Sequence, residues 1–111
     1  MNMSVNRPIM GVKEIGLLLG VPRRQITLLV EQGIINPSFG THGRGTARLF
    51  SAIEIADVYI ALDMKSVGIS PLRIRGYIIS EKSEYMGPIV QLKVDREEAL
   101  RHIICLIEET N

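Results

Sequence analysis

The chain has one cysteine and two histidines among its 111 residues, which limits the chemistry that it can support. A single cysteine, Cys105, excludes an intrachain disulfide and a cysteine-rich zinc site. His42 and His102 stand in unrelated contexts, and no Walker loop, paired-carboxylate motif or Ser/His/Asp set stands out. We therefore expect no enzymatic activity, no metal site and no cofactor.

Long apolar runs are also missing. No stretch approaches the roughly 20 apolar residues that a transmembrane helix needs. The apolar stretch Ile15–Val21 is interrupted by glycine, is followed by Arg23 and Arg24, and lacks a small-residue cleavage site. We therefore expect no signal peptide and no membrane partner, and we assign the protein to the cytoplasm.

The composition is that of a folded globular chain, with 46% hydrophobic and 23% charged residues, and the length fits one domain. The net charge is only +1, but it is unevenly distributed. Residues 1–48 carry six basic and two acidic side chains (+4), and residues 49–111 carry seven basic and ten acidic ones (−3). A basic half is typical of a part that contacts nucleic acid, although ordinary protein surfaces also show such an excess.

Glycine and proline divide the N-terminal half into two short helices. The apolar spacing predicts a helix over Val12–Leu19, followed by a tight turn at Gly20-Val21. Pro22 suits the first position of a second helix, which we expect to end near Gln32, before Gly33. Two helices joined by so short a turn form a helix-turn-helix arrangement.

The second helix has one apolar side and one side suited to DNA. Its inward side carries Pro22, Ile26, Leu29 and Val30. The candidate base and phosphate contacts on its other sides are Arg23, Arg24, Gln25, Thr27 and Leu28. In a major groove, arginine pairs with guanine, glutamine pairs with adenine, and threonine or leucine touches a thymine methyl. An ordinary amphipathic surface helix would show the same pattern, so that alternative stays open.

A hairpin is expected after the second helix. We predict a short strand at Ile34–Pro37, a loop over residues 38–45 and a returning strand at Thr46–Phe50. The loop holds three glycines together with Thr41, His42 and Arg44. Glycine lets a backbone approach a phosphate closely, and the cationic side chain pairs with it. A hairpin placed here is a wing that contacts DNA, or alternatively a flexible hairpin tip.

Two further helices follow the expected wing. Ser51 and Glu54 form a capping-box pattern, which predicts a helix that ends near Val67. This helix is apolar on two opposed sides, so we expect it to lie between two layers. One layer is the helix-turn-helix, and the other is the C-terminal segment or a partner chain. Ser70-Pro71 opens another helix, which ends near Ile79.

The C-terminal part is predicted to be a linker at residues 80–84 and a strand-helix dimerisation element at residues 85–111. Alternation predicts a strand at Val90–Val94, for which the chain offers no evident partner except the wing, and Asp95 with Glu98 opens a helix to about Glu109. Cys105, close to the apolar stripe of this helix, is interpreted as a small core residue. The stripe could instead cover the core of its own chain. The candidate dimerisation residues are Val90, Leu92, Val94, Leu100, Ile103, Ile104 and Ile107.

Four motifs occur in the order and spacing of one known family. Gly20-Val21 stands at the turn, and Glu31-Gln-Gly-Ile-Ile35 ends the second helix. Gly45–Ser51 is similar to the wing motif of that family, and Ser66–Ile74 is similar to its motif Gly-Phe/Met-Ser/Thr-Leu-x-x-Ile. On these motifs, residues 9–79 resemble the DNA-binding domain of MerR-type transcription regulators, with residues 1–8 as an N-terminal tail.

The resemblance implies a mainly α, winged helix-turn-helix protein that binds double-stranded DNA as a homodimer on a two-fold site. It implies base contacts from the second helix, where Arg24 and Thr27 lie, and phosphate contacts from the wing, where Arg48 matches an arginine of the family. The family usually has arginine and tyrosine where this chain has Thr27, Leu28 and Leu29. We therefore expect a different DNA sequence preference, with Arg23 and Arg24 as the substitutes.

Three functions are compatible with these features. The first is a sequence-specific transcriptional regulator. The second is an excisionase-like, architectural DNA-binding protein in recombination, which tandem direct-repeat sites would identify. The third is a MerR-like interaction module that binds another regulatory protein instead of DNA. The arginines retained in the basic half favour DNA binding over the third function.

Overall fold

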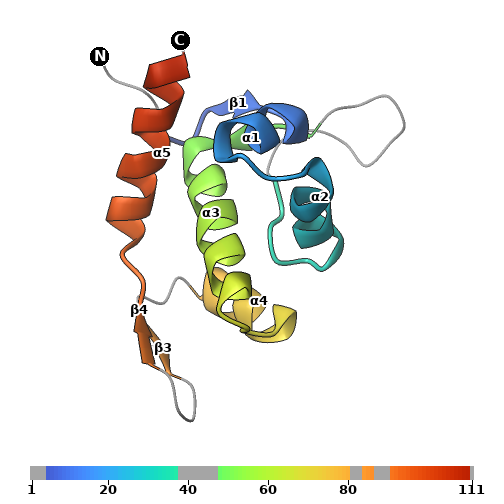
Figure 1. Cartoon of the computed structure of the whole chain (residues 1–111), viewed down its shortest axis with the longest axis vertical. Coiled ribbons are helices and arrows are strands. Elements are labelled where there is room, and N and C mark those ends of the chain that lie inside the picture. The colour runs from blue at the N-terminus through green and yellow to red at the C-terminus, as the bar shows by residue number, and fades with distance from the viewer. Residues whose placement is uncertain (1–4, 38–47, 81–83, 87–90, 111) are drawn as a thin grey trace.

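The computed structural model describes residues 5–37, 48–80, 84–86 and 91–110, and this part of the chain is mainly helical, as predicted (Figure 1). Its strands form two antiparallel pairs, β1 (Pro8–Met10) with β2 (Phe50–Ser51) and β3 (Glu84–Met86) with β4 (Gln91–Lys93). None of the helices in the described ranges is long and apolar enough to cross a membrane. The helices are α1 (Val12–Leu19), α2 (Arg23–Glu31), α3 (Ala52–Ser66), α4 (Pro71–Ile79) and α5 (Arg96–Thr110).

Helix α3 lies at the centre of the molecule, between α5 on one side and α1, α2 and α4 on the other (Figure 1). The predicted capping box starts it: the Ser51 hydroxyl accepts the Glu54 amide at 3.2 Å, and the Glu54 carboxylate accepts the Ser51 amide at 2.9 Å. Its burial on two sides is confirmed, although Ile53 and Val67 at its ends are exposed. The second covering layer is α5 of the same chain. The buried residues of α3 are Ala52, Ile55, Ala56, Val58, Ile60, Ala61 and Met64.

Helices α1 and α2 pack closely across the predicted turn. Gly20 adopts φ 69°, a left-handed conformation that favours glycine. The Val21 amide donates to the Gly16 carbonyl at 3.0 Å, and a Cβ on Gly16 would lie only 3.0 Å from the Val21 carbonyl oxygen. Ile15 and Ile26 are fully buried where the two helices meet the core. The absence of a side chain at Gly16 is therefore what allows this close turn.

The start of α2 differs from the prediction by one residue. Pro22 is the N-cap, with an extended backbone (φ −60°, ψ 139°), and its side chain is exposed rather than packed inward. The remaining inward side is confirmed, because Ile26 and Leu29 are fully buried and Val30 packs against the core. Gly33 follows the helix with φ 72°, as expected for a glycine at a helix end.

The prediction of a strand at Ile34–Pro37 is wrong. The amides of Ile34 and Ile35 both donate to the Leu29 carbonyl, at 2.9 and 3.3 Å, as part of the end of α2. Both isoleucine side chains are buried in the core. Ile34 and Ile35 therefore do not form the hydrogen bonds of a strand, because their amides bind the end of α2 and their side chains pack in the core.

Strand β2 pairs with the N-terminal segment instead. Met10 lies opposite Phe50, and the β1–β2 register shifts between Pro8 and Met10. The Ile53 amide at the start of α3 donates to the Val5 carbonyl at 3.2 Å. Residues on both sides of the expected tail boundary therefore contact β2 or the start of α3.

The C-terminal part begins with the β3–β4 hairpin, which lies beyond α4 and the start of α5 (Figure 1). Glu84 pairs with Lys93 and Met86 pairs with Gln91. The predicted strand is confirmed at Gln91–Lys93, but its partner is β3, which begins inside the expected linker. Alternation along one strand does not indicate which segment pairs with it, so this partner could not be identified from the sequence.

Helix α5 packs along α3. The predicted N-cap is confirmed, because Asp95 Oδ1 accepts the Glu98 amide at 2.9 Å. The face of α5 turned toward the core contains Ala99, Ile103 and Ile107, which are 8%, 0% and 4% exposed. Cys105 is exposed, so its interpretation as a core residue is wrong. At 100° per residue it lies about 160° from Ile103, on the opposite side of the helix.

The Arg96 side chain connects α5 to α3 and α4 through hydrogen bonds. Its Nη1 donates to Asp57 Oδ1 of α3 at 3.1 Å, and its Nη2 donates to the Tyr77 carbonyl of α4 at 3.3 Å. The guanidinium carbon also lies 5.3 Å from the centroid of the Tyr77 ring. The charged side chains of Arg96 and Asp57 are only 24% and 25% exposed, so this ion pair is partly desolvated.

We expect Arg96→Ala to lower the free energy of unfolding by about 1–3 kcal/mol, because it takes a cationic partner away from the partly desolvated Asp57 carboxylate. The matched control is Arg101→Ala, whose ion pair with Glu98 is exposed (64% and 61%). That change should cost less than about 1 kcal/mol. Chemical denaturation of both variants measures the difference, and equal losses of stability would contradict a connecting role for Arg96.

Candidate nucleic-acid interface

The outer surface of α2 carries three of the polar side chains that the sequence assigned to DNA contact. Arg23, Arg24 and Gln25 are exposed in its first turn, opposite the buried Ile26 and Leu29. Because the apolar side of α2 packs inward, the three long polar side chains are directed away from the core. The structure therefore brings these three predicted residues together on one accessible helix end.

The remaining predicted residues of α2 are less available. Thr27 and Leu28 are half-buried, and the Thr27 hydroxyl donates to the Arg24 carbonyl at 3.0 Å. Arg24 Nη1 lies 3.0 Å from Glu31 Oε1, in an ion pair whose side chains are 69% and 56% exposed. An exposed pair of this kind is weak, so a stronger ligand for the guanidinium can displace Glu31.

Two sources contribute positive charge at the N-terminus of α2, the arginine side chains and the helix dipole. Pro22 makes no side-chain cap, and the first turn contains no acidic residue. The helix dipole adds partial positive charge at the same end as Arg23 and Arg24. Arg23 forms no ion pair within the described ranges. Beside it, Lys13 and the 78% exposed Leu17 of α1 line a shallow hollow together with Arg23.

Lys13 was not among the contact residues predicted from the sequence. The basic charge of residues 1–48 included it, but a helical wheel of α2 alone cannot place a side chain of α1 beside Arg23. An anion in this hollow would meet the cationic side chains of Lys13 and Arg23, near the positive end of the α2 dipole.

Of the expected wing, the structure describes Ile34–Pro37, which form no strand, and residues 48–50. Thr41, His42 and Arg44 lie outside the described residues, so their roles stay predictions. Arg48 is half-buried, and its carbonyl oxygen lies 3.6 Å from the position of a Cβ on Gly11, next to the start of α1. The backbone of Arg48 therefore lies next to the start of α1.

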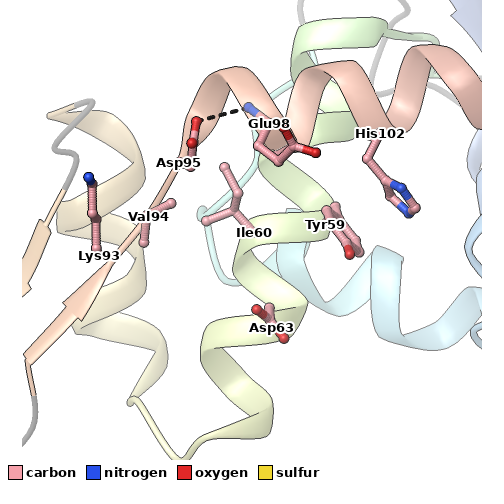
Figure 2. A pocket seen from close by; sticks show the side chains of 9 residues that line it. Tyr59, Ile60, Asp63, Lys93, Val94, Asp95, Glu98 and His102 are labelled. Carbon is pink, nitrogen blue, oxygen red and sulfur yellow. Dashed lines mark hydrogen bonds between the residues drawn. The ribbon is translucent and has the colours of Figure 1, made fainter.

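A second hollow lies between α3 and α5 (Figure 2). The rings of Tyr59 and His102 stack at its edge, with centroids 5.1 Å apart, and the buried Ile60 forms part of its wall. Asp63, Asp95, Glu98 and Lys93 also line it, so carboxylates outnumber ammonium groups there. Such a lining favours a cation over an anion. The sequence offered no signal for it, because its residues come from two segments that are 30 positions apart in the chain.

The residues expected at a dimer surface fall into three groups. Ile103 and Ile107 are buried against α3 of their own chain, so a dimer surface that used them would require α5 to leave α3. Val90 and the side chain of Leu92 lie outside what the structure describes. The members that remain available in part, because they are half-buried, are Val94, Leu100 and Ile104.

Comparisons with models of protein families, with curated proteins and with solved structures each find no match to this chain. The resemblance to MerR-type regulators therefore stays a prediction from sequence motifs. Function is accordingly inferred from the residues themselves.

Proposed function

We propose that the protein is a sequence-specific, DNA-binding transcriptional regulator of the winged helix-turn-helix type, similar to MerR regulators. In this proposal it acts in the cytoplasm as a homodimer, α2 lies in the major groove, and Thr41, His42 and Arg44 of the predicted wing contact the phosphate backbone. The observation that carries the proposal is the uncapped N-terminus of α2, where Arg23 and Arg24 are exposed beside Gln25.

This helix end is arranged unfavourably for an isolated helix. Acidic residues stabilise the first turn of a helix, whereas cationic ones oppose its dipole. Here the first turn carries two arginines and no acid, and Pro22 provides no side-chain cap. A phosphate or the acceptor edge of a guanine would offset the repulsion between the helix dipole and the arginines, because both attract the amides and the guanidinium groups. The exposed glutamine next to them adds a group that can pair with adenine.

The proposal is tested by selection of the full chain on a randomised duplex pool at two salt concentrations, with the retained sequences determined. A two-fold motif and a steep loss of affinity with salt are expected, since phosphate contacts release counterions. Selected direct repeats would instead favour an architectural role in recombination. No retention at low salt would overturn DNA binding and favour an interaction module for another protein.

We expect Arg44→Ala in the proposed wing to weaken binding to all duplexes by a similar factor. Removing one phosphate contact should reduce the slope of log K against log salt by about one unit. Titrations over a series of salt concentrations measure this slope for the wild type and the variant. A changed base preference with an unchanged slope would contradict the wing assignment.

A further inference from the structure

Helix α4 is apolar on two sides, but the described part of the chain covers only one of them. Ile74, Tyr77 and Ile78 are buried against the core. On the other side, Leu72 is 76% exposed and Ile79 is 64% exposed. Residues seven apart lie on one face of a helix, so these two form an apolar outer face of α4.

A glycine lies in the middle of this outer face. Gly76 is exposed and four residues after Leu72, and a Cβ built on it meets no atom within 4 Å. Neither a turn nor a crowded contact among the described residues therefore requires glycine at this position. Glycine weakens an exposed helix relative to alanine, but it lets the backbone of another helix approach closely.

The basic charge of α4 indicates which kind of surface could cover its outer face. The helix carries Arg73 and Arg75 and no acidic residue. The Arg75 side chain lies along the end of α2, with its Nε 3.4 Å from the position of a Cβ on Gly33. If two copies of α4 packed on each other, their exposed Arg75 side chains would bring like charges together, so the covering surface should be apolar with an acidic rim.

The same chain has such a surface on the other side of the α3–α5 contact. It is a groove of about 240 Å³, distinct from the hollow in Figure 2. Ile53 and Leu100 contribute apolar atoms to it, and the exposed Glu97 supplies a carboxylate at its rim. Asp57 and Arg96 also line the groove, and their charges neutralise each other in an ion pair. The lining residues are Ile53, Ala56, Asp57, Ile60, Arg96, Glu97 and Leu100.

We propose that a second copy of this chain covers the outer face of α4. Leu72 and Ile79 of one copy enter the α3–α5 groove of the other, Gly76 allows the close approach, and Arg75 faces Glu97. A two-fold axis repeats the contact, which is needed because one helix face is small against the roughly 1,200 Å² of a stable interface. The inference rests on the proposed function only in taking the chain as a homodimer.

Sedimentation equilibrium of the full chain without DNA tests this interface. We expect a dimer, and we expect Leu72→Gln to raise its dissociation constant by about tenfold or more, because both halves of the dimer would then bury an amide in an apolar groove. The matched control is Leu17→Gln, since Leu17 on α1 is equally exposed (78%) but lies outside the proposed interface. That variant should associate like the wild type.

Charge reversal tests the pairing of the two surfaces. Arg75→Glu and Glu97→Arg should each weaken association about fivefold or more, and the double variant should recover most of the affinity, because opposite charges face each other again. Additive effects in the double variant would contradict the proposed contact between these two residues and overturn the docking arrangement.

Gly76→Ala separates a structural role from an interface role. Alanine should raise the melting temperature of the isolated chain at low concentration and at the same time weaken dimerisation at least about threefold. A dimer that is indifferent to Leu72→Gln and Gly76→Ala would overturn this interface but leave the homodimer standing. A chain that stays monomeric at about 100 µM would overturn the interface and the homodimer, whereas the duplex selection still decides DNA binding.

Discussion

Ile103→Ala should be among the most destabilising single substitutions in α5, lowering the free energy of unfolding by about 2–5 kcal/mol. The side chain is fully buried between α5 and α3, so truncation removes apolar packing and leaves a cavity. Urea denaturation at two protein concentrations tenfold apart measures the effect. The destabilisation should be the same at both concentrations, because the packing lies within one chain.

Cys105→Ala is the matched control for this substitution. It shortens a side chain two positions further along the same helix, but Cys105 is exposed. Its stability should change by less than about 0.5 kcal/mol, as is usual for surface positions. If Ile103→Ala instead weakened dimerisation and left the monomer as stable as before, α5 would be a dimerisation helix rather than the second layer over α3.

Local signals predicted the helices well because the residues that start and stop a helix act on its own backbone. Ser51 and Glu54 form both hydrogen bonds of the capping box, and Gly20, Gly33 and Gly68 all adopt positive φ after a helix. These conformations depend on neighbours within four residues, which the sequence shows directly.

Long-range pairing was the part that the sequence could not supply. Periodicity indicates which side of a helix or strand is apolar, but not which segment covers it. Strand β2 pairs with Met10 rather than with Ile35, and β4 pairs with β3 rather than with the expected wing. The stripe at Ile103 is buried within the chain, an outcome that its spacing could not distinguish from burial against a partner.

The candidate interface was predicted in part. The exposed trio at the start of α2 followed from a helical wheel, because the buried side of a short helix is set by its own apolar residues. Lys13 could not be placed in this way, because it comes from the neighbouring helix. The wheel puts Arg24 and Glu31 on one face of α2, but it does not show that their long side chains meet in an ion pair.

The second large prediction is the effect of Arg24→Ala on DNA binding, and it depends on the Arg24–Glu31 ion pair. Under the proposed function, Arg24 leaves Glu31 and contacts a base edge, so its removal should weaken specific binding by about 1–3 kcal/mol and relax the preference at one base position. Repeating the duplex selection with the variant measures both effects. A lower affinity with an unchanged sequence preference would mean that Arg24 contacts phosphate rather than a base.

Glu31→Gln is the informative partner variant, because it keeps Arg24 and removes the carboxylate that lies 3.0 Å from its guanidinium. The exposed pair is worth about 0.2–1 kcal/mol, so freeing the guanidinium should tighten DNA binding by about 1.4-fold to fivefold. Removal of one negative charge near the DNA acts in the same direction. If Glu31→Gln weakened binding instead, the ion pair would be holding Arg24 in its DNA-contacting position. The proposed displacement of Glu31 by a base would then be wrong.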